Sequence, residues 1–151
     1  MKKLSFKGII IGSITDIVSS NIFQIPLFVW ITISLSRSGV SQEQMKSAII
    51  LALHDNASYF LFSVMIGGSC SILGGYVAAK IAKQHEVLNG TLASFLCIFG
   101  SLYTIFTGTS QFPLWQQIFF LLLSPVLTAF GGYLRSRQVI AQAHNSKKKQ
   151  F

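Results

Sequence analysis

The sequence is short of charge. Only 11% of its 151 residues are Asp, Glu, Lys or Arg, against roughly 25% in ordinary soluble domains, whereas 51% are hydrophobic. A soluble domain of this length needs more charge to cover its surface, and a surface that faces lipid does not. The scarcity of charge argues against an ordinary soluble enzyme and predicts a chain that lies in a membrane.

Acids and cysteines are scarcer still, with four Asp and Glu residues and two Cys in the whole chain. Cys70 and Cys97 both fall inside apolar stretches, where we interpret them as reduced thiols rather than a disulfide. Neither they nor the three scattered histidines have the spacing of metal ligands. The chain offers no nucleophile with a base, no carboxylate dyad and no glycine-rich phosphate loop. We therefore predict no enzyme activity, no metal and no cofactor.

What the chain has in abundance is long apolar sequence, arranged as four stretches at about 8–35, 59–79, 87–108 and 113–134. A hydrocarbon layer about 30 Å thick is crossed by about 20 apolar residues in a helix, at ~1.5 Å per residue. Each stretch is long enough to cross once. The sequence predicts an all-α, four-helix transmembrane bundle that forms a single membrane domain over residues 1–151.

Basic residues are unevenly distributed between the connections. Ten of the 12 lie before residue 8, between residues 80 and 83, or after residue 134, and only Arg37 and Lys46 lie in the connection 36–58. Basic residues in short loops mark the cytoplasmic side, so we expect both termini in the cytoplasm. The net charge of +8 is then an orientation signal and predicts no binding of nucleic acid. Residues 138–151 are interpreted as a basic, disordered cytoplasmic tail.

The connection 36–58 has the pattern of a short amphipathic helix. Ser41 and Gln44 have capping-box spacing, and Asn56 can cap the next span. Apolar residues then recur at i, i+3, i+4, i+7 and i+8, at Met45, Ala48, Ile49, Ala52 and Leu53. We expect this helix at the outer membrane interface or on the bundle.

Small residues mark the faces where helices are expected to pack. In the second span they recur at four-residue steps, at Gly67, Ser71, Gly75 and Ala79, with Gly74 beside them. Small residues allow two backbones to approach closely, which is how helices associate in lipid. The second span ends with Gly74-Gly75-Tyr76 and the fourth with Gly131-Gly132-Tyr133. The pattern predicts packing between the second and fourth spans or across a homodimer, and a second interpretation is a duplicated hairpin.

Asp16 is the one acidic residue inside a span. At 100° per residue, Ser13, Ser20 and other small or polar residues share its face of the helix, and isoleucines and valines occupy the opposite face. The sequence therefore directs Asp16 into the bundle. A carboxylate at such a depth costs at least ~2.5 kcal/mol when ionised, and no span contains a Lys or Arg to compensate it.

Two roles are open for Asp16. It can be protonated and donate a hydrogen bond that locks the bundle, or it can line a wet cavity and bind or relay a proton or cation with Ser13 and Ser20. An intramembrane acid is by default a candidate functional site, although transporters usually have several. The two roles differ in whether the helices enclose a hydrated cavity at Asp16 or pack shut around it.

Several segments resemble a family of small, uncharacterised bacterial inner-membrane proteins with four spans. The resemblance is carried by the residues from Gly12 to Asp16, the segment 39–43, the run from Gly74 to Ala82 with Leu88-Asn89-Gly90, and Gly131-Gly132-Tyr133-Leu134. The run from Gly74 to Ala82 is the most specific. The resemblance implies a four-span fold and a bacterial inner membrane, and it implies no activity, ligand or catalytic residue.

Taken together, these patterns predict a multi-pass inner-membrane protein that is not an enzyme. Its expected partners are the lipid bilayer and a second copy or another membrane subunit, held through the small-residue face. The alternative is a small proton- or cation-linked transporter that uses Asp16.

Overall fold

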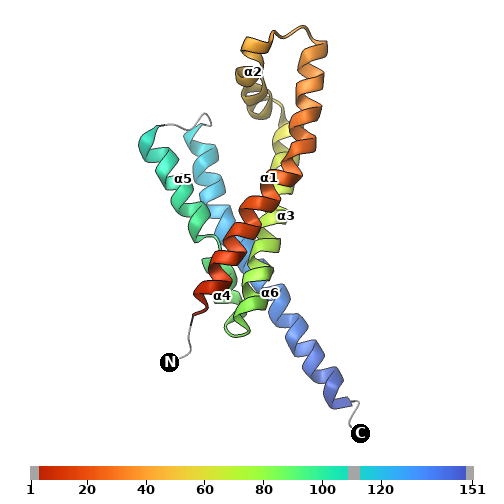
Figure 1. Cartoon of the computed structure of the whole chain (residues 1–151), viewed down its shortest axis with the longest axis vertical. Helices are drawn as coiled ribbons and strands as arrows, with labels where there is room; N and C mark the ends of the chain where they lie inside the picture. Colours follow the sequence, from red (N-terminus) through yellow and green to blue (C-terminus); the bar gives the residue numbers. More distant parts are fainter. Residues whose placement is uncertain (1–3, 109–112, 149–151) are drawn as a thin grey trace.

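The computed structural model describes residues 4–108 and 113–148, and within them every regular element is a helix. The helices are labelled in Figure 1: α1 (Phe6–Arg37), α2 (Gln42–Asp55), α3 (Ala57–Ala82), α4 (Glu86–Leu92), α5 (Phe95–Thr107) and α6 (Leu114–Lys148). The predicted all-α fold is confirmed.

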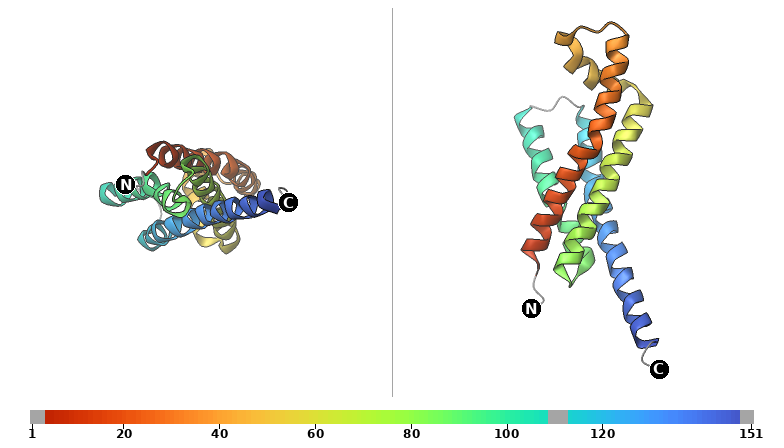
Figure 2. Two further views of the ribbon diagram at one scale, coloured as in Figure 1. Left: turned by 90° about the horizontal axis from the view of Figure 1, so that it is seen from below. Right: turned by 45° about the vertical axis from the view of Figure 1, so that its right-hand side comes forward.

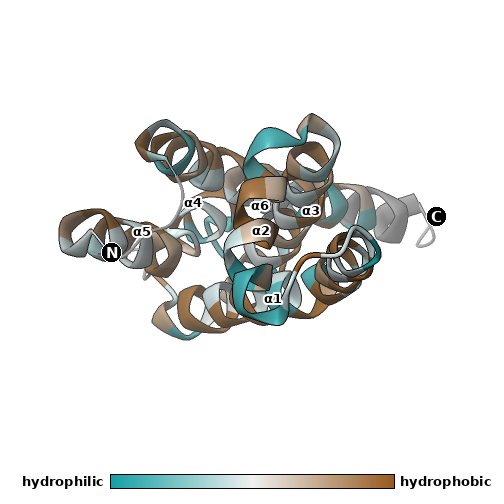
Figure 3. Cartoon of the chain, turned by 90° about the horizontal axis from the view of Figure 1, so that it is seen from above, coloured by the Kyte–Doolittle hydropathy of each residue, from teal (hydrophilic) through white to brown (hydrophobic). Residues whose placement is uncertain are grey.

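Four helical segments are long and apolar enough to cross a membrane: Phe6–Arg37, Ala57–Ala82, Glu86–Thr107 and Leu114–Gln142. Their apolar side chains point outward, and brown, hydrophobic ribbon covers most of the periphery in Figure 3. On α1, the predicted lipid-facing stripe is exposed at Ile14, Val18, Ile22, Ile25 and Val29. An apolar exterior of this extent is stable only in a lipid environment. The chain is a multi-pass membrane protein.

The bundle has one tightly packed end and one loosely packed end. The tightly packed end, called the closed end below, contains α4, the start of α1 and the end of α3 (Figure 1). The loosely packed end, called the open end, carries α2. The start of α1 and the end of α6 lie at the same end of the bundle. In the right-hand view of Figure 2, α6 passes behind α1 and α3, and Figure 1 shows α5 leaning away from α1 toward the open end.

At the closed end, α1 and α3 meet through glycine. A Cβ built on Gly12 would lie 2.7 Å from the carbonyl oxygen of Gly74, and one on Gly74 would lie 2.8 Å from the carbonyl oxygen of Gly12. Gly8 meets the carbonyl oxygen of Ala78 in the same way, at 2.8 Å. Because real Cβ atoms do not approach a carbonyl oxygen so closely, glycine is required at this crossing.

The two Gly-Gly-Tyr motifs pack against each other, as predicted for the second and fourth spans. A Cβ on Gly75 would overlap the backbone of Thr128 on α6, and one on Gly131 would overlap the backbone of Ile72 on α3. Gly132 allows α4 to approach α6 closely, since a Cβ built on it would lie 2.6 Å from the carbonyl oxygen of Glu86. Each glycine pair thus contacts one helix of its own hairpin and one helix of the other.

The small-residue face of α3 divides into two parts. Ala79, like Gly74 and Gly75, is buried inside the chain. A Cβ on Gly67, by contrast, would meet nothing within 4 Å. Only the half of the face near the closed end is therefore used for packing within the chain.

The third span is interrupted, whereas the sequence predicted one continuous helix over 87–108. α4 ends at Leu92 and α5 begins at Phe95, with a turn at Ala93 and Ser94. The Ser94 hydroxyl donates to the carbonyl oxygen of Thr91 at 2.8 Å, and the Ser13 hydroxyl of α1 donates to the carbonyl oxygen of Ala93. Hydroxyl groups can satisfy backbone carbonyls at such a break inside a membrane. The break lets α4 stay against α6 while α5 leans away.

The ends of the chain also differ from expectation. The tail predicted to be disordered from residue 138 is helical as far as Lys148, in direct continuation of α6. No Gly or Pro follows Gly132 in this segment, and Gln, Ala, Arg and Lys are good helix formers. Residues 149–151 of the predicted tail lie outside the described residues.

The predicted amphipathic helix of the connection 36–58 exists as α2. Its expected capping hydrogen bond is absent, because the Ser41 side chain accepts none from the helix. The cap predicted at Asn56 is present, since its side-chain oxygen accepts from the backbone N–H groups of Ser58 and Tyr59. Whether α2 lies at the membrane interface stays a prediction.

Candidate functional site

Asp16 lies in the middle of the bundle, as the face of α1 predicted. It is only 2% exposed, and its Cβ packs against Gly74 of α3. The glycine contact between α1 and α3 therefore fixes the backbone that carries the carboxyl group. Asp16 is held by the same packing that closes the bundle.

Three side chains from three helices donate hydrogen bonds to this carboxylate. The Ser71 hydroxyl of α3 lies 3.2 and 3.1 Å from its two oxygens, and the Ser20 hydroxyl of α1 lies 3.4 Å from Oδ1. The Cys97 thiol of α5 lies 3.6 Å from Oδ2. These donors have no formal charge, so the structure gives Asp16 hydrogen bonds but no counter-ion within the described residues.

Ser13, the third residue proposed from sequence for an ion site, does not join this set. Its hydroxyl is fully buried and lies within hydrogen-bond reach of the carbonyl oxygens of Ile9 and Ala93. Ser13 thus contacts the backbone at the break between α4 and α5. Of the three residues proposed for an ion site, only Asp16 and Ser20 lie in hydrogen-bond contact.

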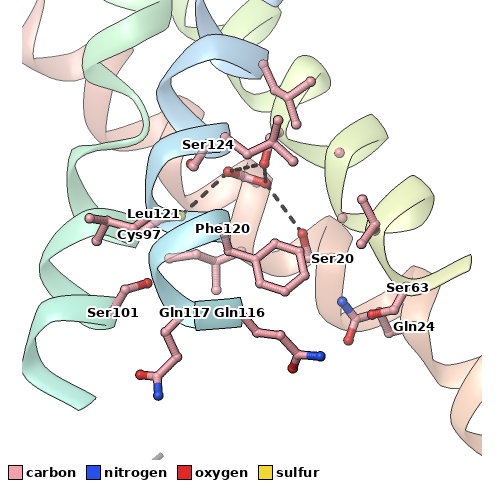
Figure 4. Close-up of a pocket in the computed structure, with 18 of the residues that line it drawn as sticks. Ser20, Gln24, Ser63, Cys97, Ser101, Gln116, Gln117, Phe120, Leu121 and Ser124 are labelled. Atoms are coloured by element: carbon pink, nitrogen blue, oxygen red, sulfur yellow. Dashed lines mark hydrogen bonds between the residues drawn. The ribbon is translucent and has the colours of Figure 1, made fainter. Parts of the chain in front are cut away.

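A cavity of about 800 Å³ extends from Asp16 toward the open end, between α1, α3, α5 and α6. Its walls carry more polar groups than a lipid-facing surface would. Hydroxyl groups come from Ser20, Ser63, Ser71, Ser101, Thr104 and Ser124, and carboxamides from Asn21, Gln24, Gln116 and Gln117. Figure 4 shows this wall, with hydrogen bonds from Ser20 and Cys97 drawn as dashed lines. Asp16 lies at the inner end of this cavity, whose walls combine polar and apolar side chains.

The cavity exists because the helices are not in contact there. A Cβ on Gly67, which lines the cavity, would meet nothing within 4 Å, and one on Gly68 would meet only Leu127, at 3.3 Å. In the closed half, the other glycines lie against backbone atoms. The interruption of the third span and the unused glycines together leave space beside Asp16.

Ser124 of α6 adds an unpaired polar atom to the cavity. Its hydroxyl oxygen is shielded from solvent and has no hydrogen-bond partner among the described residues. A shielded hydroxyl normally has a partner, because leaving it unpaired costs about 1–3 kcal/mol. In a cavity, water or a bound solute can supply that partner.

Aromatic side chains line the cavity toward the open end. Phe60 of α3 and Phe120 of α6 both face it, with ring centroids 6.1 Å apart, and Trp115 lies 6.1 Å from Phe60. Lys46 of α2 also lines this end and is exposed to solvent. The cavity therefore has Asp16 at one end, and polar and aromatic side chains together toward the open end.

Sequence reasoning missed several of these residues. Cys97 was predicted to be a reduced thiol, with no contact to Asp16 foreseen, and Gln116 and Gln117 were not considered. Both glutamines lie in the predicted fourth span, where carboxamides are costly to bury, and that was a usable signal. No three His, Cys, Asp or Glu side chains within the described segments come together as metal ligands would.

No protein family, curated protein or solved structure matches this chain in the comparisons. The resemblance to a family of four-span inner-membrane proteins stays a prediction.

Proposed function

We propose that the chain is a small proton- or cation-linked transporter whose binding group is Asp16. The observation that carries the proposal is the polar cavity that extends from this residue. An acid that served only to lock the bundle would be enclosed by packed helices. Here the hydrogen-bonding partners of the acid themselves line an open space.

The surroundings of Asp16 support binding of a positive charge. α1, α3 and α5 present hydroxyl groups and the Cys97 thiol to the carboxylate, and none of these groups is cationic. An ionised carboxylate at this depth is unfavourable without a partner, so a proton or a cation must occupy the site. Exchange between the two at one carboxylate is the simplest form of coupling between a proton and a second cation.

The interrupted third span is also consistent with transport. Transporters typically bind their substrates near the middle of the membrane, where broken helices free backbone groups from regular pairing. The break at Ala93 and Ser94 is linked to α1 by Ser13, three residues from Asp16. Asp16 therefore lies within one helical turn of Ser13, the residue that contacts the break.

We further propose a bacterial inner membrane, with both termini in the cytoplasm. The support is the excess of basic residues at the end of the bundle where α1 begins and α3 ends, which is the closed end. In this orientation the cavity faces the outside of the cell. Transport then requires a second conformation, in which the closed end opens.

The test is ion flux in proteoliposomes. Asp16→Asn keeps the size of the side chain and removes its charge, so we expect the pH-dependent flux to fall to that of empty vesicles while thermal stability stays nearly unchanged. Asp55→Asn is the matched control, since Asp55 is an exposed acid outside the cavity. A variant that keeps its flux, or one that mainly loses stability, would favour a structural role for Asp16.

The alternative proposal is a protein that works by assembly, as a homo-oligomer or a subunit of a membrane complex. The face of α3 expected to hold a partner is occupied within the chain at Gly74, Gly75 and Ala79. A partner would need another surface, and α5 has one at Gly100, where a Cβ would meet nothing. Equal flux from wild-type vesicles and empty vesicles would favour assembly.

A further inference from the structure

We propose that the solute carried by this site is a protonated primary amine with an apolar body, held with its ammonium group against the hydroxyls of Ser20 and Ser71 at the Asp16 end. This substrate class rests on the proposed transport function. It is carried by three features of the cavity: its volume, the direction of the hydrogen bonds at Asp16 and the aromatic and aliphatic side chains on its walls.

The volume is too large for a proton pathway alone. A water molecule occupies about 30 Å³ in the liquid, and small-molecule pockets are typically about 300–1,000 Å³. The cavity, at about 800 Å³, falls within the second range. Its size fits an organic solute.

The direction of the hydrogen bonds decides the polar group of that solute. Ser20 and Ser71 each have one hydroxyl proton, and each donates it to the Asp16 carboxylate. Their remaining capacity is as acceptors, so a ligand beside them must donate. Asp16 itself is 2% exposed, so a solute in the cavity meets these two hydroxyl oxygens before it meets the carboxylate.

The charge of Asp16 selects a cationic donor over a neutral one. Hydroxyls that donate to an anion are polarised, and their oxygens become stronger acceptors. A primary ammonium group has three N–H donors and a positive charge, which satisfies both hydroxyls and compensates the carboxylate. A quaternary ammonium has the charge but no donor. An alcohol can donate but has no charge.

The walls also suit an apolar body. Phe60, Phe120, Leu121 and Leu127 line the cavity among its polar side chains, so a solute there contacts aromatic and aliphatic groups. Among the described residues Lys46 is the one basic side chain on the cavity wall, and it is exposed at the far end, where water screens its charge. An aryl-alkyl amine matches the acidic end of the cavity and these apolar groups.

The two cysteines of the chain provide a direct test. Cys97 lies on the cavity wall beside Asp16, whereas Cys70 is 1% exposed and does not line the cavity. Full-length protein in liposomes is treated with N-ethylmaleimide, and the alkylation rate of each cysteine is followed by mass spectrometry. The added probes are phenethylamine, its N,N,N-trimethyl derivative and 2-phenylethanol, three molecules with the same aromatic body.

We expect phenethylamine to slow the alkylation of Cys97 by about tenfold at ten times its dissociation constant, as mass action requires. The trimethyl derivative and the alcohol should protect weakly or not at all, and Cys70 should react slowly throughout. Ser20→Ala and Ser71→Ala should each reduce the protection by phenethylamine, with every variant compared to its own unprotected rate.

Three results would overturn the proposal. Equal protection by the trimethyl derivative or by the alcohol would refute the argument from donors and charge. Absence of protection by any probe, with an Asp16-dependent proton flux still present, would refute the amine and leave the proposed transport function. If Cys97 reacts no faster than Cys70, no organic solute of this size reaches the cavity wall and the amine is refuted, while loss of the Asp16-dependent flux as well would overturn the proposed transport function.

Discussion

Two glycines of α3 that look equivalent in the sequence should respond in opposite ways to the same substitution. Gly67 and Gly75 belong to one series of small residues at four-residue steps. A Cβ on Gly75 would overlap the carbonyl group of Thr128 on α6, and a Cβ on Gly67 would meet nothing within 4 Å. We predict that Gly75→Ala destabilises the protein and that Gly67→Ala does not.

The magnitude follows from a comparison of the two variants. Alanine gains about 1 kcal/mol over glycine inside a helix, and this gain is common to both positions. Gly75→Ala also forces α3 and α6 apart, because the atoms in the way belong to the backbone and cannot rotate aside. Overpacking of this kind typically costs about 1–3 kcal/mol. The difference in unfolding free energy between the two variants should therefore be about 1–3 kcal/mol.

Cys70 can report this difference. In a Cys97→Ser background it is the only thiol, and it is buried on α3, so it reacts only when the bundle opens. A cost of about 1–3 kcal/mol corresponds to alkylation roughly 5- to 150-fold faster in Gly75→Ala than in Gly67→Ala. Equal rates would show that the two helices can separate without loss, and the close approach of α3 to α6 would then not stabilise the fold.

Two further predictions concern orientation and the closed end. A membrane-impermeant thiol reagent added outside intact cells should modify Cys97 and leave Cys70 unmodified, and modification of Cys97 only from the cytoplasmic side of inverted vesicles would reverse the proposed orientation. Asn89→Ala should cost about 1–3 kcal/mol in an unfolding titration, because the buried Asn89 side chain accepts from the Ser5 N–H and donates to the carbonyl oxygens of Gln84 and His85. Asn21→Ala is its control: Asn21 is exposed and, within residues 4–108 and 113–148, bonds only to the Ile17 carbonyl oxygen of its own helix, so a change above about 0.5 kcal/mol there would contradict this reasoning.

The sequence predicted the elements of this fold well because their signals are local. Apolar length predicts a membrane-crossing helix without any knowledge of its neighbours. The inward direction of Asp16 also followed from local pattern, since the isoleucines and valines of α1 occupy the opposite face. The pairing of the two Gly-Gly-Tyr motifs was within reach for the same reason, because small residues at regular spacing indicate a contact even before the partner is known.

The cavity was beyond sequence reasoning because it depends on which contacts are not made. Gly67 continues the small-residue series of α3, but it lies in the open half, where no other helix packs against it. Cys97 and Ser101 line the cavity because the third span breaks at Ala93 and Ser94. Neither Ala93 nor Ser94 is a strong helix breaker, so the break was not predicted from the sequence. Ser20 was predicted beside Asp16 because it lies one turn away on the same helix, whereas Ser71 and Cys97 come from helices distant in the chain, so no pattern within one helix could place them there.

By itself, the sequence determined that this protein crosses a membrane and that its one intramembrane acid faces inward. Both follow from how apolar and polar side chains partition around a single helix. Only the tertiary structure decided that the closed half packs through glycines while the open half leaves a polar cavity beside Asp16. That division depends on helix crossing and on a break in one helix, which are properties of the assembled bundle.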